Sequence, residues 1–408
     1  MTLNKIQYNY FLFLFSIIPI SIVIGQSVSL INILLIDISF IILMILNKNF
    51  SFFQNKSIKY FFILYIYLIF NSIISTDYTL GLYRNIGFLR MIILFMAFNF
   101  FFTQKYFFDK VFKFWLLVIS IILVDTLIES FFGQNILGYG EQYGRRLVSF
   151  FKDEPIVGGF LNSFYLLLIG YLFLKLKKIN NYKIYLFSLF FLLVIFLTGE
   201  RANSIKALLG VIIFFSFFSE FNLKKKILIL ITFLIVVFVS IKSSTFLENR
   251  FIDQIRYMKT GDSLYFKLYK SGYQVFQNYR FFGVGNKNYR FETCKNAGDS
   301  KVELQKNKNS YLCSTHPHQI YFEFLSEHGI FGSIILFFVF YKLLFRKIKY
   351  TVQNKNYLQL GCLVYLVLIF LPLIPSGAFF GNYVLSLFMI NMSIFYGCDK
   401  NLNIFLKI

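Results

Sequence analysis

The sequence is poor in charged residues, and this shortage narrows the class of protein at once. Asp, Glu, Lys and Arg make up 15% of its 408 residues, whereas a typical soluble domain carries about 25%. Hydrophobic residues reach 57%, and the mean hydropathy is +0.65. This balance excludes a soluble enzyme, a disordered tail and a small secreted module stapled by disulfides. A polytopic membrane protein remains.

Acidic residues are scarcer than basic ones: 19 Asp and Glu stand against 41 Lys and Arg, which gives a formal net charge of +22. Such an excess can indicate a nucleic-acid-binding protein. Here, however, the basic residues form short clusters between apolar runs and not one patch, as is typical of the cytoplasmic loops of membrane proteins. We therefore expect membrane lipids as surroundings and no nucleic-acid partner.

Twelve continuous apolar runs predict an all-α polytopic membrane protein with about 12 transmembrane helices. They cover approximately residues 10–25, 28–46, 60–74, 87–102, 114–132, 156–174, 184–198, 204–218, 227–241, 330–345, 358–374 and 383–397. The strands of a membrane barrel would instead alternate polar with apolar residues. No small-residue cleavage site follows the first run, so we interpret it as a span and not as a signal peptide.

Lysine clusters predict the orientation of these spans. With the N-terminus in the cytoplasm, the loops expected inside carry clusters such as residues 224–226. The short loops expected outside are almost free of basic residues: 25–27 and 375–382 have none, and 75–86 has only Arg84. Because positive residues stay on the cytoplasmic side, we expect both termini to be cytoplasmic.

Residues 242–329 form the longest stretch between two predicted spans and are too polar to contain a missed one. Long loops are translocated regardless of their charge, so we expect a large, folded periplasmic loop between spans nine and ten. The chain then divides into spans one to nine (1–241), this loop with an amphipathic helix (242–329), and spans ten to twelve (330–408). All three histidines, His316, His318 and His328, lie in the loop.

Two of the four cysteines, Cys294 and Cys313, also lie in this loop. In an oxidising compartment we expect them to form a disulfide that closes the lysine-rich stretch between them. The alternatives are two free thiols, or a zinc site in which both cysteines join His316 and His318. The spacing lacks the paired form that is usual for structural zinc.

A helix is expected over residues 320–328, where apolar residues recur at helical spacing. Pro317 would stand at its start, and Gly329 would cap its end. We interpret this helix as amphipathic, lying at the outer membrane interface, with His318 in its first turn. A histidine there can exchange a proton near neutral pH. The alternative is a partly exposed surface histidine.

The residues around His318 carry a resemblance to a known family. His318-Gln319 is followed, after nine residues, by Gly329 and then by Gly332. This resembles the signature of the bacterial O-antigen ligase/polymerase family, in which such a histidine lies at the membrane end of the large periplasmic loop. Three upstream segments are similar to further family motifs in the same order: Arg146–Pro155, Thr198–Arg201 and Phe282–Gly285. Together the motifs cover about residues 140–335.

The resemblance implies a reaction: transfer of a glycan from undecaprenyl diphosphate to an acceptor hydroxyl, on the periplasmic face of the bacterial inner membrane. It implies His318 as the catalytic general base, and Arg146 and Arg201 as groups that bind the diphosphate. His316 would either support the base or be a solvated neighbour. Arginine binds phosphate bidentately, and histidine takes a proton from an alcohol. Anchoring at the membrane interface is the alternative for each arginine.

The resemblance also implies which residues have structural roles. At one place this sequence departs from the family's pattern. Structural roles would fall to Gly283, Gly285, Gly329, Gly332 and the cysteine pair. The family often has an arginine shortly before the Gly-x-Gly turn, whereas residues 262–270 contain none. The residues that could replace it are Lys267, Lys270, Arg280 and Arg290. A lysine would lack the bidentate fork of arginine, and the choice stays open.

Other patterns are missing from the sequence. There is no glycine-rich phosphate loop after a strand, no nucleotide-sugar domain and no acidic pair placed to hold a metal beside the histidines. We therefore expect a lipid-linked donor, no metal and no cofactor.

Three functions remain. A ligase would move a finished glycan onto the lipid A core, and a polymerase would join lipid-linked repeat units. The sequence motif around His318 resembles that of the ligases more closely than that of the polymerases. A transporter or flippase without catalysis is the alternative of another class, although the sequence has no internal repeat and its one large loop breaks two-half symmetry.

Overall fold

The computed structural model describes residues 3–48, 50–140, 146–152, 154–176, 181–218, 222–242, 244–253, 263–294 and 311–406. Over these residues the chain is all-helical, as its apolar runs predict. The helices are α1 Lys5–Ser16, α2 Ile18–Ile24, α3 Gln26–Leu46, α4 Lys56–Ile73, α5 Tyr78–Ile86, α6 Leu89–Phe102, α7 Phe107–Phe132, α8 Val157–Lys175, α9 Asn181–Leu197, α10 Arg201–Ser216, α11 Leu223–Lys242, α12 Thr245–Glu248, α14 Leu264–Asn278, α15 Tyr289–Cys294, α16 Ile320–Leu343, α17 Ile348–Asn354, α18 Tyr357–Ile369 and α19 Asn382–Gly397. Shorter turns are η1 Ser51–Gln54, η3 Ser149–Phe151, η4 Asn249–Asp253 and η5 Phe345–Lys347.

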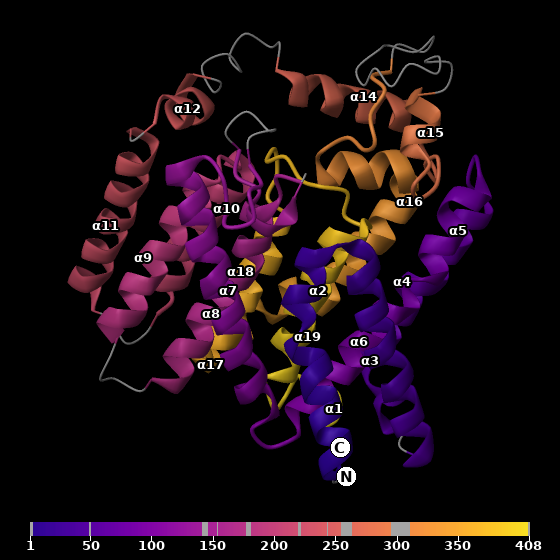
Figure 1. The fold of residues 1–408 in the computed structure, drawn as a ribbon. Coiled ribbons are helices and arrows are strands. Elements are labelled where there is room, and N and C mark those ends of the chain that lie inside the picture. The colour runs from indigo at the N-terminus through magenta and orange to yellow at the C-terminus, as the bar shows by residue number, and fades with distance from the viewer. Residues whose placement is uncertain are drawn as a thin grey trace.

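The long helices run side by side as a bundle (Figure 1). Helices α12, α14 and α15 lie across one end of the bundle, and both chain ends lie at the opposite end (Figure 1). Helices α12, α14 and α15 therefore form a cap over this end of the bundle.

Helices α8 and α18 form the centre of the bundle and pack backbone against backbone. A Cβ atom at Gly170 of α8 would lie 2.3 Å from the Tyr357 carbonyl oxygen, and one at Gly361 of α18 would lie 2.1 Å from the Leu166 carbonyl oxygen. Small residues at a contact let membrane helices approach this closely. Helix α10 packs on both of them, which places the starts of α8 and α10 next to the end of α18.

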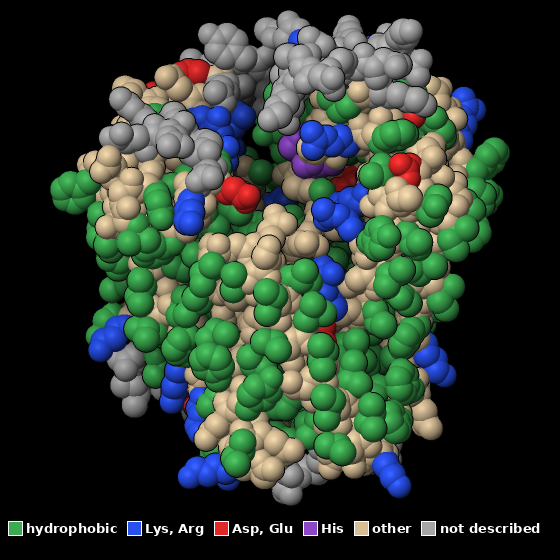
Figure 2. Space-filling view, turned by 45° about the vertical axis from the view of Figure 1, so that its right-hand side comes forward, with side chains coloured by type: hydrophobic (Ala, Val, Ile, Leu, Met, Phe, Trp, Pro, Cys, Tyr) green, Lys and Arg blue, Asp and Glu red, His purple; other side chains and the backbone are tan. Residues whose placement is uncertain are grey.

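The outer surface has the character of a membrane protein. Large apolar side chains are exposed along α3 and α11, and examples are Ile31, Leu34, Ile38, Leu228 and Leu234. Figure 2 shows hydrophobic side chains covering the middle of the molecule, with Lys and Arg side chains gathered towards its two ends. A surface this apolar is stable in lipid and not in water.

Each of the twelve expected spans falls on a helix, but their number stays a prediction. Six helices within the described ranges are long and apolar enough to cross a membrane, or eight if two bent pairs each count as one span. The other four expected spans fall on α9, α10, α18 and α19, which have 13 to 17 residues.

Two local features could not be predicted from the apolar runs. The first run falls on two helices: α1 and α2 meet at Ile17 with a bend of 42°, because Pro19 at the start of α2 lacks an N–H for the preceding turn. Residues 75–86 are not only a loop, since α5 occupies Tyr78–Ile86. The Asp77 side chain accepts a hydrogen bond from the Thr79 amide and caps α5.

Candidate functional site

His318 lies immediately before α16, and not in the first turn of a helix as the sequence predicted. Helix α16 begins at Ile320, and the side chain of its N-cap Gln319 accepts a hydrogen bond from the Tyr321 amide at 2.8 Å. His318 itself has a φ of 57°, a left-handed conformation that a helical turn cannot contain. Its carbonyl accepts a hydrogen bond from the Ser376 amide at 2.9 Å. A long-range contact to the segment between α18 and α19 therefore fixes the backbone at His318.

The rings of His316 and His318 are in contact, with their centroids 3.9 Å apart and their planes tilted by 37°. His316 Nε2 lies 3.2 Å from the Ser376 carbonyl oxygen, and Nδ1 lies 2.9 Å from the Thr315 hydroxyl. A carbonyl only accepts, so Nε2 donates to it and Nδ1 accepts from the hydroxyl. Burial, with His318 close by, lowers the pKa of His316 to about 3. His316 is thus neutral at physiological pH and held by protein contacts, which differs from the solvated position that was one expectation.

The Gly-x-Gly turn, with Gly283 and Gly285, packs against α16 where that helix kinks. The sequence predicted that the helix would end at Gly329, but α16 kinks there (φ 62°, ψ −166°) and continues to Leu343. At the kink the Glu327 carbonyl accepts a hydrogen bond from the Gly285 amide at 2.9 Å. A Cβ atom at Gly283, whose φ is +70°, would lie 2.3 Å from the Glu327 carbonyl carbon. Turn and helix are therefore in backbone contact.

Two further expected structural features lie near this turn. A disulfide joins Cys294, at the end of α15, to Cys313, which is the pairing that the sequence favoured. Because zinc binds thiolates, a disulfide between them excludes the alternative zinc site. Gly332 packs against α4, where a Cβ atom would lie 1.7 Å from the Tyr67 hydroxyl oxygen.

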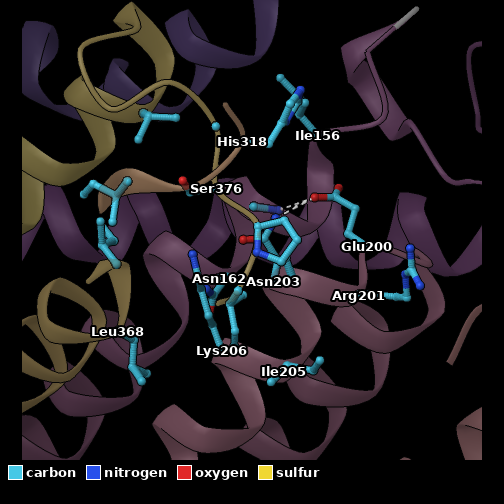
Figure 3. Close-up of a pocket in the computed structure, with 18 of the residues that line it drawn as sticks. Ile156, Asn162, Glu200, Arg201, Asn203, Ile205, Lys206, His318, Leu368 and Ser376 are labelled. Atoms are coloured by element: carbon cyan, nitrogen blue, oxygen red, sulfur yellow. Dashed lines mark hydrogen bonds between the residues drawn. The ribbon is translucent and has the colours of Figure 1, made fainter. Parts of the chain in front are cut away.

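A cavity of about 600 Å³ opens beside His318. Figure 3 shows His318, Arg201 and Lys206 among the side chains that line it, and Figure 2 shows a hollow with basic, acidic and histidine side chains near the capped end of the molecule. Arg146 also lines the cavity. The three residues that the sequence analysis assigned to the base and the diphosphate are therefore brought together.

The cavity is strongly basic. Of the charged residues that the structure describes in its lining, four are basic and one is acidic, namely Arg146, Arg201, Lys206, Arg250 and Glu200. Arg146 Nη2 donates to the Pro155 carbonyl at 2.9 Å. Within the described part of the chain, Arg146 Nε and Arg201 Nη1 are buried without a hydrogen-bond partner. These N–H groups are available to an anion.

Arg250 was not identified from the sequence. It lies on η4, beyond the end of α11, and its Nε and Nη2 atoms are each 3.3 Å from the Gly199 carbonyl oxygen at the start of α10. It interacts electrostatically with both Arg146 and Arg201. Three guanidinium groups thus face one space, which favours the binding of a multiply charged anion.

Among the described residues Glu200 forms no salt bridge with these arginines, and its carboxylate oxygens are instead hydrogen-bonded by the protein. Glu200 Oε1 accepts a hydrogen bond from the Gly158 amide at 2.6 Å, and Oε2 accepts from the Gly159 amide at 3.1 Å and from Asn203 Nδ2 at 2.7 Å. Figure 3 marks the contact with Asn203. Burial raises the pKa of Glu200, an effect that Asn203 and Arg146 oppose. The carboxylate caps the N-terminus of α8.

Four residues that the sequence suggested for substrate binding lie elsewhere. Lys267 and Lys270 on α14, Arg280 after it and Arg290 on α15 are exposed, and none of them lines the cavity. Arg280 Nε donates to the Gln277 carbonyl of its own turn. Their short spacing from the Gly-x-Gly turn does not bring them to the cavity, because the face of α14 that carries Lys267 and Lys270 is exposed, as are Arg280 and Arg290 beyond it.

The sequence did contain a signal for Lys206. It lies inside the apolar run 204–218, and a charged residue within a span usually faces a cavity. Arg250 had no such signal, since it lies among the polar residues that follow α11.

Residues 186–337 match the family model described as O-antigen ligase. The match runs from α9 into α16 and includes Arg201, Arg250 and His318 but not Arg146. None of the curated proteins compared with the chain matches it.

Proposed function

We propose that this chain is a membrane glycosyltransferase of the O-antigen ligase family, which moves a glycan from undecaprenyl diphosphate to an acceptor hydroxyl; the match of residues 186–337 to that family model supports this. One observation carries the proposal. The cavity gathers His318 with Arg146, Arg201 and Arg250, which are far apart in the sequence. A base beside a cluster of cations is what this reaction requires.

The arginines would bind the leaving group. When the bond between the sugar C1 and the diphosphate oxygen breaks, its electron pair stays on the diphosphate, whose negative charge grows. Guanidinium groups already directed at that position stabilise the transition state without reorganising. The buried Arg146 Nε and Arg201 Nη1 atoms, which have no partner among the described residues, support this role.

His318 would act as the base. As the acceptor oxygen forms its bond to C1, its proton passes to the His318 imidazole, which later releases it to water. His316 would support this step, because its neutral ring lies against that of His318 while its own nitrogens form hydrogen bonds with Thr315 and Ser376. The left-handed backbone at His318, fixed through Ser376, keeps the ring at the cavity.

Arg250 would take the place of the arginine that the family often has before its Gly-x-Gly turn. Its position at the cavity supports this, whereas Lys267, Lys270, Arg280 and Arg290 lie outside the lining. Arginine is also better suited than lysine to bidentate contact with phosphate.

The lipid of the donor would follow the apolar part of the same cavity. Ile205 of α10 and Leu368 and Ile369 of α18 line it there. A polar end rich in arginine and an apolar end within the helix bundle fit a diphosphate joined to an isoprenoid chain.

The acceptor distinguishes a ligase from a polymerase. We propose a ligase that works on the periplasmic face of the inner membrane with the lipid A core as acceptor. The sequence motif around His318 supports this, because it resembles that of the ligases more closely. A polymerase would use the same donor chemistry on a lipid-linked repeat unit. The acceptor side of the cavity, near Tyr265, is where the two would differ.

A gene deletion tests the function. Lipopolysaccharide from the deletion strain and its pool of lipid-linked glycans are analysed together, with the complemented strain as control. A ligase predicts bare core with long polymer accumulating on undecaprenyl diphosphate. A polymerase predicts core with one repeat unit and carrier with single units. A normal gel together with a normal carrier pool contradicts both, and then a transporter becomes the better account.

A further inference from the structure

Lys206 is a buried cation that the reaction described above does not use. It lies on α10 within the cavity lining, and its residue is only 8% exposed. In the part of the chain that the structure describes, Lys206 has no hydrogen-bond or ion-pair partner. Glu200, the one acidic residue among the described residues of the lining, already has the Gly158 and Gly159 amides and Asn203 as partners.

An unpaired buried ammonium group is costly, and proteins usually pair such a group or remove it. Lys206 lies within α10 and lines the cavity, unlike the lysines at helix ends that reach water along the membrane surface. From Arg201 to Lys206, α10 advances roughly 7.5 Å, so the backbone of Lys206 lies deeper in the helix bundle than that of Arg201. Figure 3 shows Lys206 together with Asn162 and Ile205, on the opposite side of the view from His318.

The surroundings indicate what the missing partner is. At this level the lining is otherwise apolar or neutral, with Ile205, Leu166, Leu368 and Asn162. A ligand that reaches Lys206 from the arginines must carry an anionic group and be followed by an apolar chain. A diphosphate between a sugar and an isoprenoid has this order.

We propose that Lys206 binds the phosphate that is attached to the lipid, while the arginines bind the phosphate that is attached to the glycan. This division rests on the function proposed above and adds to it a residue specific for the diphosphate. Lys206 then selects donors whose second phosphate lies inside the membrane-facing part of the cavity.

Two measurements on the purified full-length protein test this. The first is the affinity for geranylgeranyl diphosphate, a short isoprenoid diphosphate, obtained from its thermal stabilisation of the protein. Loss of a charged hydrogen bond should weaken that affinity about tenfold or more in Lys206→Met. The control Lys225→Met, which removes an exposed lysine from the start of α11, should bind as the wild type does.

The second measurement is the melting temperature without ligand. Because methionine has a similar length and no charge, Lys206→Met should melt higher than the wild type. A lysine with a merely structural role predicts a lower melting temperature. The proposed pattern is thus a more stable protein that binds the diphosphate less well.

The outcomes distinguish the proposed role of Lys206 from the proposed function of the protein. Wild-type affinity in Lys206→Met overturns the role of Lys206 and leaves the function standing. Absence of binding in the wild type contradicts a diphosphate donor itself. A second probe, phosphatidylglycerol, covers the other source of a lipid phosphate: if Lys206→Met weakens its binding and not that of geranylgeranyl diphosphate, Lys206 holds a membrane phospholipid and the assignment to the donor is overturned.

Discussion

The Glu200 carboxylate accepts a hydrogen bond from the Gly158 amide at 2.6 Å, so the residue next to Arg201 holds the start of α8. This contact joins two sides of the cavity. Glu200→Ala leaves the Gly158 and Gly159 amides without partners and should lower the free energy of unfolding by about 1–3 kcal/mol. Thermal unfolding of the purified protein measures this. Glu154→Ala, at an exposed carboxylate, is the control, and equal melting temperatures of the two variants would contradict the role of Glu200.

The neutral state of His316 predicts a pH dependence of stability. The folded protein keeps His316 unprotonated down to about pH 3, whereas the unfolded chain takes up a proton near the ordinary pKa of 6.5. The unfolded state therefore binds more protons between these values, and stability falls as the pH is lowered below 6.5, by at most about 1.4 kcal/mol per pH unit.

His316→Asn removes this contribution. Its melting temperature should decline less than that of the wild type between about pH 7 and about pH 5. Identical declines in the two proteins would show that His316 is protonated equally in the folded and unfolded states.

The cavity arginines and the exposed arginines should differ in function. Arg250→Gln should reduce glycan transfer about tenfold to a hundredfold, because a charged hydrogen bond to the leaving group is lost. Arg280→Gln removes the same charge from the surface of the cap and should change the rate by less than about twofold. The measurement is transfer by membranes that contain equal amounts of each variant. A larger loss in Arg280→Gln than in Arg250→Gln reverses the assignment.

The contact between the Gly-x-Gly turn and α16 predicts the effect of a single methyl group. Gly283→Ala adds a Cβ atom 2.3 Å from the Glu327 carbonyl carbon, so it combines backbone strain with overpacking and should cost about 2–4 kcal/mol. Gly138 has a similar positive φ of +81° but open space around its Cβ position, and Gly138→Ala should cost only about 1 kcal/mol. Melting temperatures of the two variants test the difference, and equal values would contradict a close contact.

The sequence was sufficient for the helical class and for part of the site. Continuous apolar runs predict helices because lipid leaves the backbone no other partner, and every expected span lies on a helix. His318 and Arg201 were found through local motifs. A local motif is informative there because a short segment, such as the start of α10, fixes the side chain.

Residues placed by long-range contacts could not be predicted. Arg250 reaches the cavity because the chain beyond α11 returns to the Gly199 carbonyl, and no local pattern records this. The start of α16 at Ile320 was predicted, but the left-handed backbone of His318 was not, because it is fixed by the hydrogen bond from the Ser376 amide to the His318 carbonyl. In the same way, Lys267 and Lys270 looked suitable by spacing, but the face of α14 that carries them is exposed.

The measurement that tests the account most directly is glycan transfer by His318→Asn, with purified protein and a lipid-linked donor. Loss of a general base should lower the rate at least about a hundredfold. The binding of geranylgeranyl diphosphate and the melting temperature should stay as in the wild type, since His318 is not among the groups proposed to hold the phosphates. Transfer at the wild-type rate in His318→Asn would contradict the catalytic role of His318 and, with it, the central claim.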